Sequence, residues 1–423
     1  WVDNNTSVTE YMNHITLPID IESLEIVSQT LDAQGNIVIE VKSKKNSISC
    51  HKCQKPTTKR YDTAPVIQIR HLPILDTPVY LKIYPVRYQC KECDDNPTTT
   101  ETYDWCSKGS SLTKGLEKYL MRNLIHSTVQ DVAKKDGIGY KALTAALNRQ
   151  INQKVDWDEY KNLDTIGIDE ISMKKGYKSY VTIVSSRNKQ GDLSVIAVIE
   201  GRLKEDIEDF LNSIPSHLKK TVKTLCTDMY DGFVNAATSV FGDKVVVIDR
   251  YHVAKLYREP LDKLRIAEMQ RLKGELSAEE YTKLEGVMWS LRKKYECLTE
   301  ANKLALDTIY EYSPSLKKAH GYALKLTHIF NTHSNRKLGL AKLDRWIISV
   351  QKSDLKCFDK FISTLKKYKP YIANYFKKRR NSGFVEGLNN KIKVVKRRCY
   401  GFFNNESLFQ RLYLDLKGYA MIA

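Results

Sequence analysis

The 423-residue chain contains no long hydrophobic stretch, because its apolar runs reach only five residues, as at 195–199. A membrane-spanning helix needs roughly 20 apolar residues in succession. No signal-peptide pattern follows Trp1, the residue with which the chain begins. We therefore expect a cytoplasmic protein with no membrane partner.

Cysteine and acidic residues are also scarce. Nine cysteines are too few to hold a chain of this length together as a disulfide scaffold. The 50 Asp and Glu residues are outnumbered by 68 Lys and Arg residues, which gives a net charge of +18. Hydrophobic residues at 42% and charged residues at 28% exclude a largely disordered chain. A folded and strongly basic protein favours a polyanionic partner, with nucleic acid as the first hypothesis.

Proline is concentrated at one end and missing from long stretches elsewhere. Seven of the eleven prolines lie in the first 97 residues, beside alternating β-branched segments such as 37–41 and 79–86. This pattern predicts a small β-rich module. Between 261 and 313, and again between 315 and 369, there is no proline, and Leu, Lys, Glu and Tyr repeat at helical spacing. These stretches predict a mostly helical block.

Four of the cysteines form two CxxC pairs within the β-rich module, and they are Cys50, Cys53, Cys90 and Cys93. Thiolates two residues apart can bend toward one metal ion, so the pairs predict a tetrahedral structural zinc site. Reduced cysteines without metal are the alternative. His51 and Cys106 stay unassigned as substitute ligands.

Residues 127–150 predict a helix-turn-helix. Ser127 and Gln130 have the spacing of a capping box, and Gly137 offers a turn before a second helix from about Tyr140. Three apolar residues of that second helix are expected to pack inward, namely Leu143, Ala146 and Leu147. The residues expected on the DNA-facing side are Lys141, Thr144, Asn148 and Arg149. An ordinary helical hairpin is the alternative.

Residues 165–249 alternate between strand and helix patterns. Strands are predicted at 165–171, 180–185, 193–200, 221–227 and 244–249, with helices at 205–213 and 233–241. Asp169 and Asp228 each follow an apolar strand run as it stops. If these two strands are neighbours, the carboxylates meet and need cations between them, and oxygen ligands suit magnesium or manganese.

A third carboxylate lies in a basic segment near the C-terminal end. On a helix, one stripe is apolar and comprises Phe384, Leu388, Ile392 and Val395. Glu386 and Asn390 fall on the roughly opposite stripe, with Lys393 and Arg397. The surrounding cations also include Lys391, Lys396 and Arg398, as expected where phosphates approach a metal-binding carboxylate.

Several short strings together resemble the ISL-three family of bacterial insertion-sequence transposases. They are Gly-Ile-Asp-Glu at 167–170, Thr-Asp-Met at 227–229 with Asp-Gly-Phe at 231–233, Asp-Arg-Tyr-His-Val at 249–253, and Gly-Phe-Val-Glu-Gly-Leu-Asn-Asn-Lys-Ile-Lys at 383–393 with Lys-Arg at 396–397 and Gly-Phe at 401–402. The resemblance implies a DDE transposase with an RNase H-like fold, in which Asp169, Asp228 and Glu386 hold two Mg²⁺ (or Mn²⁺) ions. Asp231 and Asp249 compete with Asp228 for the second position. Asp249 and His252 resemble an auxiliary element of related enzymes.

The resemblance also completes the expected organisation, a multidomain protein of α+β and α/β class. We expect a zinc-finger module (1–110), a helix-turn-helix (111–155), an RNase H-like domain in two parts (156–255 and 376–423) and an all-helical insertion between them (256–375). Asp228 and Glu386 are 158 residues apart, which leaves room for that insertion. The expected partner is double-stranded DNA, both element terminal inverted repeats and target, bound by a homodimer or larger assembly in the bacterial nucleoid. A non-catalytic DNA-binding regulator and a metal-dependent nuclease without strand transfer stay as alternatives.

Overall fold

The computed structural model describes residues 19, 21–151, 155–173, 180–377, 383–402 and 404–422. The chain divides into two compact units, Trp1–Gln150 with Gly418–Ala423, and Ile151–Lys417. Each unit is described by itself. Within the described residues, no helix is both long and apolar enough to cross a membrane.

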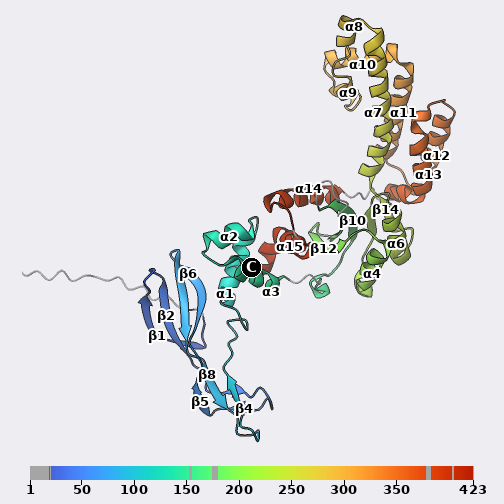
Figure 1. The fold of residues 1–423 in the computed structure, drawn as a ribbon. Coiled ribbons are helices and arrows are strands. Elements are labelled where there is room, and N and C mark those ends of the chain that lie inside the picture. The colour runs from blue at the N-terminus through green and yellow to red at the C-terminus, as the bar shows by residue number, and fades with distance from the viewer. Residues whose placement is uncertain are drawn as a thin grey trace, which may run out of the picture. The chain divides into compact units, whose positions relative to one another are not determined.

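The first unit opens with a four-stranded sheet in the order β1 (Leu24–Leu31), β2 (Ile37–Ser43), β7 (Thr77–Ile83), β6 (Ile67–Ile74) (Figure 1). β2 and β7 are parallel, and the other two pairs are antiparallel. Alternate residues such as Val79, Leu81 and Ile83 are buried with Trp105, which is the period of two expected for a sheet with one packed face.

Short strands carry the four cysteines. β3 (Ile48–Ser49) pairs with β4 (Pro56–Thr57), and β5 (Arg60–Thr63), β8 (Val86–Gln89) and β9 (Thr98–Thr100) form a three-stranded sheet in that order. Cys50 directly follows β3, and Cys90 directly follows β8. The predicted β-rich module is confirmed.

Three helices complete the first unit, α1 (Lys114–Leu124), α2 (Val129–Lys135) and α3 (Tyr140–Gln150). The predicted capping box is wrong by one residue, because the Thr128 hydroxyl, and not that of Ser127, accepts the helix N–H, from Asp131 at 3.0 Å. Gly137 has a φ of +59°, as the turn before α3 requires. Leu143, Ala146 and Leu147 of α3 are buried as predicted.

The second unit contains a five-stranded mixed sheet in the order β12 (Leu193–Glu200), β11 (Tyr180–Arg187), β10 (Thr165–Ser172), β13 (Thr224–Thr227), β14 (Val246–Ile248). β10, β11 and β12 pair antiparallel, while β13 and β14 continue parallel to β10. Three helices connect the strands, α4 (Lys204–Ser213), α5 (Ser216–Lys219) and α6 (Asp231–Phe241). The predicted order of strands and helices is present with one addition, the short helix α5, and β13 begins at Thr224 rather than 221.

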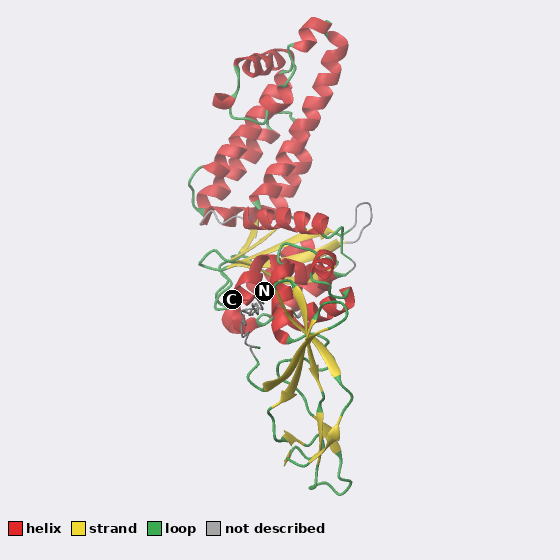
Figure 2. Cartoon of the chain, turned by 90° about the vertical axis from the view of Figure 1, so that its left-hand side faces the viewer, coloured by secondary structure: helices red, strands yellow, loops and turns green. Residues whose placement is uncertain are grey.

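A block without strands follows β14 and extends to residue 377 (Figure 2). Its helices are α7 (Arg250–Glu275), α8 (Ala278–Thr282), α9 (Val287–Ser290), α10 (Glu300–Tyr312), α11 (Pro314–Asn331), α12 (Arg336–Gln351) and α13 (Asp359–Asn374), with short 3₁₀ turns at Tyr295–Cys297, Lys356–Phe358 and Tyr375–Lys377. α7 runs directly on from Asp249 and continues through Pro260. The Asn374 side chain donates to the carbonyls of Asp243 and Val246 at 2.7 Å, which ties the block to the edge strand β14.

The C-terminal helices are α14 (Gly383–Arg398) and α15 (Asn405–Ile422). At the other end of the second unit, a 3₁₀ turn at Trp157–Glu159 precedes the sheet. The buried side chains of α14 are Val385, Leu388, Ile392 and Val395. The predicted apolar stripe is therefore confirmed with one addition, since Val385 is buried and Phe384 is only half-buried. Glu386, Asn390, Lys393 and Arg397 are exposed, as the opposite stripe requires.

Candidate active site and zinc site

The four cysteines of the CxxC pairs meet in space, with their sulfur atoms all within 4.8 Å of one another. Cys90 Sγ lies 3.7 Å from Cys53 Sγ and 3.8 Å from Cys93 Sγ. Sulfurs at the corners of a tetrahedron around zinc, at about 2.3 Å from the metal, are about 3.8 Å apart. The group therefore has the composition and the size that a structural zinc ion requires.

The backbone around Cys50 favours its thiolate form. The amides of Cys53 and Lys52 donate toward the sulfur and lower the pKa of the Cys50 thiol to about 6. The two unassigned substitutes are engaged elsewhere: the His51 ring bonds the Thr99 hydroxyl at 2.9 Å, and the Cys106 thiol lies against the carbonyl oxygens of Ser107 and Ser110. All four ligand positions are thus supplied by the two pairs.

The second site is built on neighbouring parallel strands. Gly167 of β10 is paired with Cys226 of β13, and extending this register by two residues places Asp169 level with Asp228. Asp169 lies within β10, and Asp228 directly follows β13, so the two residues are neighbours at the C-terminal end of β13. The Asp228 carboxylate accepts the Tyr230 N–H at 3.1 Å, and the Asp169 carboxylate accepts the Glu170 N–H at 2.8 Å.

Negative charge accumulates around these two carboxylates. Burial, together with the charges of Asp169 and Glu170, raises the pKa of the Asp228 carboxyl to about 6, against the lowering effect of His252. Two carboxylates that repel each other in this way favour a cation between them. Their oxygen atoms are the ligands that Mg²⁺ and Mn²⁺ prefer.

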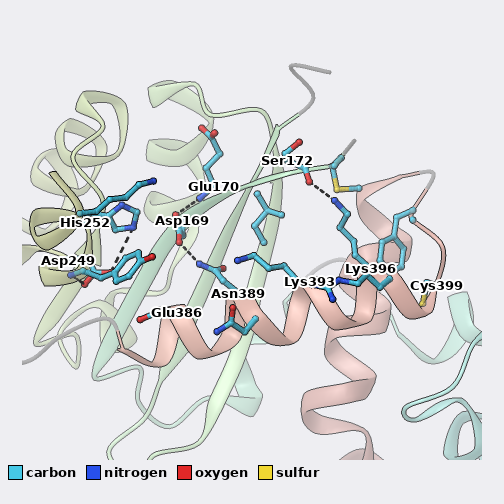
Figure 3. A pocket seen from close by; sticks show the side chains of 18 of the residues that line it. Asp169, Glu170, Ser172, Asp249, His252, Glu386, Asn389, Lys393, Lys396 and Cys399 are labelled. Atoms are coloured by element: carbon cyan, nitrogen blue, oxygen red, sulfur yellow. Dashed lines mark hydrogen bonds and ion pairs between the residues drawn. The ribbon is translucent and has the colours of Figure 1, made fainter. Parts of the chain in front are cut away.

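Glu386 reaches the same region from α14. It lines a cavity of about 1210 Å³ together with Asp169, Asp249 and His252 (Figure 3). Asp228 lies outside the described lining of this cavity. Among the described residues, the three carboxylates do not form a group with oxygens all within 4.8 Å of one another. The expected juxtaposition of Asp169 and Glu386 at one cavity is present, while the metal-binding distances stay a prediction.

Asn389 is a site residue that the sequence pattern did not single out. Its side-chain amide donates to the Asp169 carboxylate from the middle of α14, as Figure 3 shows. The helical pattern of the sequence favours Asn390 instead, which is exposed on the same helix. The adjacent pair of asparagines could have suggested either residue, and only the rotation of α14 on the sheet distinguishes them.

The competing acids have other partners. Asp231, at the start of α6, accepts hydrogen bonds from Tyr368 at 2.6 Å and from Lys367 at 2.5 Å, both on α13. Asp249 caps α7 by accepting the Tyr251 N–H at 3.0 Å, and its other oxygen is 4.0 Å from His252 Nε2. Asp249 and His252 thus form a pair at the cavity wall, whereas Asp231 joins the sheet domain to the helical block.

The basic residues of α14 divide into two groups. Lys393 and Arg397 are exposed and line the cavity, and Lys396 lines it while donating to the Ser172 carbonyl at 2.7 Å. Lys391 donates instead to the Asp415 carbonyl at 2.6 Å, and Arg398 pairs with the Asp415 carboxylate at 2.8 Å. Those two cations hold α14 against α15 in this structure.

A close contact between β10 and α14 sets the position of Glu386. A Cβ added to Gly167 would lie 2.3 Å from a methyl group of Val385, the residue before Glu386. We expect Gly167→Ala to shift α14 and to lower the free energy of unfolding by about 1 to 3 kcal/mol. Thermal unfolding measures this effect. Gly274→Ala is the control, because that added Cβ meets no atom within 4 Å. Equal stability of Gly167→Ala and the wild type would contradict the close packing of β10 against α14.

The Asp415 carboxylate is the buried counter-charge for two arginines. Its side chain is 1% exposed and pairs with Arg398, and its charge also acts on the buried Arg411. We expect Asp415→Ala to lower the free energy of unfolding by about 3 kcal/mol, because it leaves buried positive charge uncompensated. Urea unfolding measures the loss. The exposed Asp209→Ala should stay within about 0.5 kcal/mol of wild type, and a matching small effect for Asp415→Ala would refute the structural role.

The predicted DNA-facing residues of α3 also differ among themselves. Lys141 and Asn148 are exposed, and the Thr144 hydroxyl donates to the Tyr140 carbonyl at 2.9 Å. Arg149 forms an ion pair with the completely buried carboxylate of Glu117, and it also donates to the Ser110 hydroxyl at 3.1 Å. Arg149 thus has a structural role in holding α3 against α1, and its predicted DNA contact is untested.

The chain thus combines a four-cysteine cluster with a mixed sheet that carries acidic residues beside a basic cavity. Comparison with protein families identifies the class of protein to which it belongs. The zinc-finger model of the transposases IS204, IS1001, IS1096 and IS1165 matches residues 46–93, and a transposase model of the ISL3 group matches residues 166–412. Because the second match covers more than half of the chain, the protein belongs to the ISL3 transposase family. The predicted resemblance is confirmed.

Curated relatives have the same description. The chain is 23% identical to the transposase for insertion sequence element IS1001 of Bordetella parapertussis, over 94% of this chain and 96% of the relative. It is 25% identical to the transposase for insertion sequence element IS1557 of two Mycobacterium tuberculosis strains, over 62% of each chain. The first similarity spans both units of the structure.

Proposed function

We propose that this transposase is a DDE enzyme that cuts DNA at insertion-sequence ends and joins the resulting 3′-hydroxyl to target DNA. The observation that carries the proposal is the shared register of Asp169 and Asp228, beside a cavity that Glu386 enters from α14. An RNase H-like catalytic domain is supported by the strand order, in which three antiparallel strands are followed by two parallel ones. The packing of α14 across β10 supports it as well. The helical block between β14 and α14 is then the insertion.

In this proposal Asp169, Asp228 and Glu386 hold two Mg²⁺ (or Mn²⁺) ions, which would activate water and then a DNA 3′-hydroxyl for attack on a phosphodiester. Asn389 orients the Asp169 carboxylate through its amide. Lys393 and Arg397 bind the DNA phosphates that enter the cavity, since both are exposed on its wall. The pair Asp249 and His252 has an auxiliary role beside the ligands.

One assay separates the proposed activity from its alternatives. Purified protein is given an element end with a free 3′-hydroxyl, a supercoiled target plasmid and Mg²⁺. Joined product supports the transposase mechanism. Cleavage without joining would indicate a metal-dependent nuclease, and end binding with neither reaction would indicate a DNA-binding regulator.

We further propose that α2 and α3 form a helix-turn-helix that reads element ends, while α14 binds phosphates of any sequence. Lys141→Ala and Asn148→Ala should then lower the preference for element ends over scrambled duplex, by about 1 to 3 kcal/mol where a base contact is lost. Lys393→Ala and Arg397→Ala should weaken binding to both duplexes equally and lessen the dependence on salt. Binding titrations at several salt concentrations measure both effects. Equal losses on both duplexes for Lys141→Ala and Asn148→Ala would assign α3 to a phosphate clamp or a structural hairpin.

Synapsis of two element ends requires at least two copies of the chain, so the active form is proposed to be a homodimer or larger assembly on DNA. Sedimentation of the protein with end DNA tests this. A complex of one chain with one DNA end under conditions that support joining would overturn it.

A further inference from the structure

A second basic cavity lies inside the helical insertion. It has a volume of about 820 Å³ and is formed by α7, α11 and the segment that follows α9. Its floor and walls include apolar side chains such as Leu291, Ala323 and Leu324. Six cations line it, namely Arg250, Lys255, Arg258, Arg292, Lys293 and Lys294.

The two acids of this cavity already form ion pairs, one of them with a cation of the cavity itself, Arg292. Glu259 pairs with Lys263 at 2.8 Å, and Asp262 pairs with Arg265 at 2.8 Å and with Arg292 at 3.1 Å. By contrast, four of the six cations form no ion pair within the described part of the chain, and they are Lys255, Arg258, Lys293 and Lys294. The cavity therefore carries a surplus of positive charge that internal contacts do not use.

The two cavities adjoin at the first turns of α7. Tyr251 and Lys255 line both the catalytic cavity and the insertion cavity. The Tyr251 side chain is 51% exposed, so its ring is available for stacking. Cations that follow a backbone, together with an aromatic ring on which a base stacks, are the means by which proteins bind single-stranded nucleic acid.

We propose that the insertion cavity binds an unpaired segment of the DNA whose adjoining duplex occupies the catalytic cavity. The strand passes over Tyr251, which stacks on a base, and its phosphates contact Lys255, Arg258, Lys293 and Lys294. The apolar wall at Leu291 and Leu324 contacts the faces of the following bases. A cavity of this volume is in the range of small-ligand pockets, so it accommodates a few nucleotides but no duplex. The inference rests on the proposed function, because that function brings DNA to the catalytic cavity.

The test compares two labelled DNAs, a blunt duplex and the same duplex with a short unpaired extension, binding to the full-length protein without added Mg²⁺. Wild type should prefer the extended DNA. The double variant Lys293→Gln/Lys294→Gln should reduce that preference about tenfold. It should also decrease the slope of log affinity against log salt concentration for extended DNA by about 1.4, the value for two phosphate contacts on a single strand. Tyr251→Ala should reduce the preference by roughly tenfold or more without changing the slope. The matched control Lys356→Gln/Lys366→Gln removes two exposed lysines outside both cavities and should leave the preference unchanged.

Three outcomes would overturn the inference: no preference for the extended DNA in wild type, equal losses on blunt and extended DNA in the cavity variant, or competition by a free mononucleotide as effective as competition by the extension. Thermal unfolding of each variant shows that the fold is retained. Mg²⁺-dependent cleavage is measured in parallel, so its failure in wild type counts against the proposed function alone.

Discussion

Asp169→Ala, Asp228→Ala and Glu386→Ala should each reduce DNA cleavage by more than about 100-fold, while binding to element ends persists. Loss of a residue that only orients a metal ligand typically lowers metal affinity or activity by about 10- to 100-fold. Removal of a ligand itself should lower the cleavage rate by more than that. Binding persists because α2 and α3, which are proposed to read DNA, belong to the other compact unit. Cleavage of a labelled end duplex with Mg²⁺, and titration of the same duplex without it, provide the two measurements.

Asp231→Asn is the matched control for the second carboxylate. Asp231 is only three residues beyond Asp228, yet its carboxylate accepts hydrogen bonds from Lys367 and Tyr368 of α13. The amide substitute retains an acceptor for the Tyr368 hydroxyl, so we expect cleavage near the wild-type rate. Loss of cleavage in a folded Asp231→Asn, together with an active Asp228→Ala, would assign the second ligand to Asp231 instead.

Cys90→Ser should remove zinc and unfold the small strands that carry the four cysteines. Apparent binding free energies of about 10 to 16 kcal/mol hold structural zinc in fingers of this kind, far more than a module of a few short strands can replace by burial. The expected result is a zinc content near zero, with loss of protease resistance confined to residues near 46–100. Elemental analysis and limited proteolysis measure these effects.

Cys106→Ser is the control for the zinc prediction. The Cys106 thiol contacts backbone carbonyl oxygens and lies outside the four-sulfur group, so this variant should retain one zinc ion per chain. Treatment with a strong chelator should reproduce the Cys90→Ser phenotype in the wild type. Full zinc content in Cys90→Ser, or loss of zinc in Cys106→Ser, would show that the ligand set is wrong.

Local features of the fold could be predicted because each depends on residues close together in the chain. The CxxC spacing brings two thiolates within reach of one metal whatever the surrounding fold. Short apolar stretches located β10, β11 and β12, and the ends of the apolar runs located Asp169 and Asp228. The spacing of Leu388, Ile392 and Val395 indicated which face of α14 would be buried, and hence that Glu386 would be exposed. The cap of α2 was placed one residue early, because Ser127 and Thr128 are both competent caps and only the backbone conformation chooses between them.

The partners of charged and amide side chains depended on contacts between residues far apart in sequence. Asn389 reaches Asp169 across 220 residues, and Asp231 reaches Tyr368 across 137. Likewise, Lys391 and Arg398 hold α15 through Asp415, and Arg149 neutralises the buried Glu117, although each appeared in the sequence as an exposed cation suited to DNA. The sequence alone determined which residue types were available on each helix face and strand end. Only the tertiary structure decided which of them were paired, because the free energy of a polar group depends on whether folding buries an opposite charge or hydrogen-bond partner beside it.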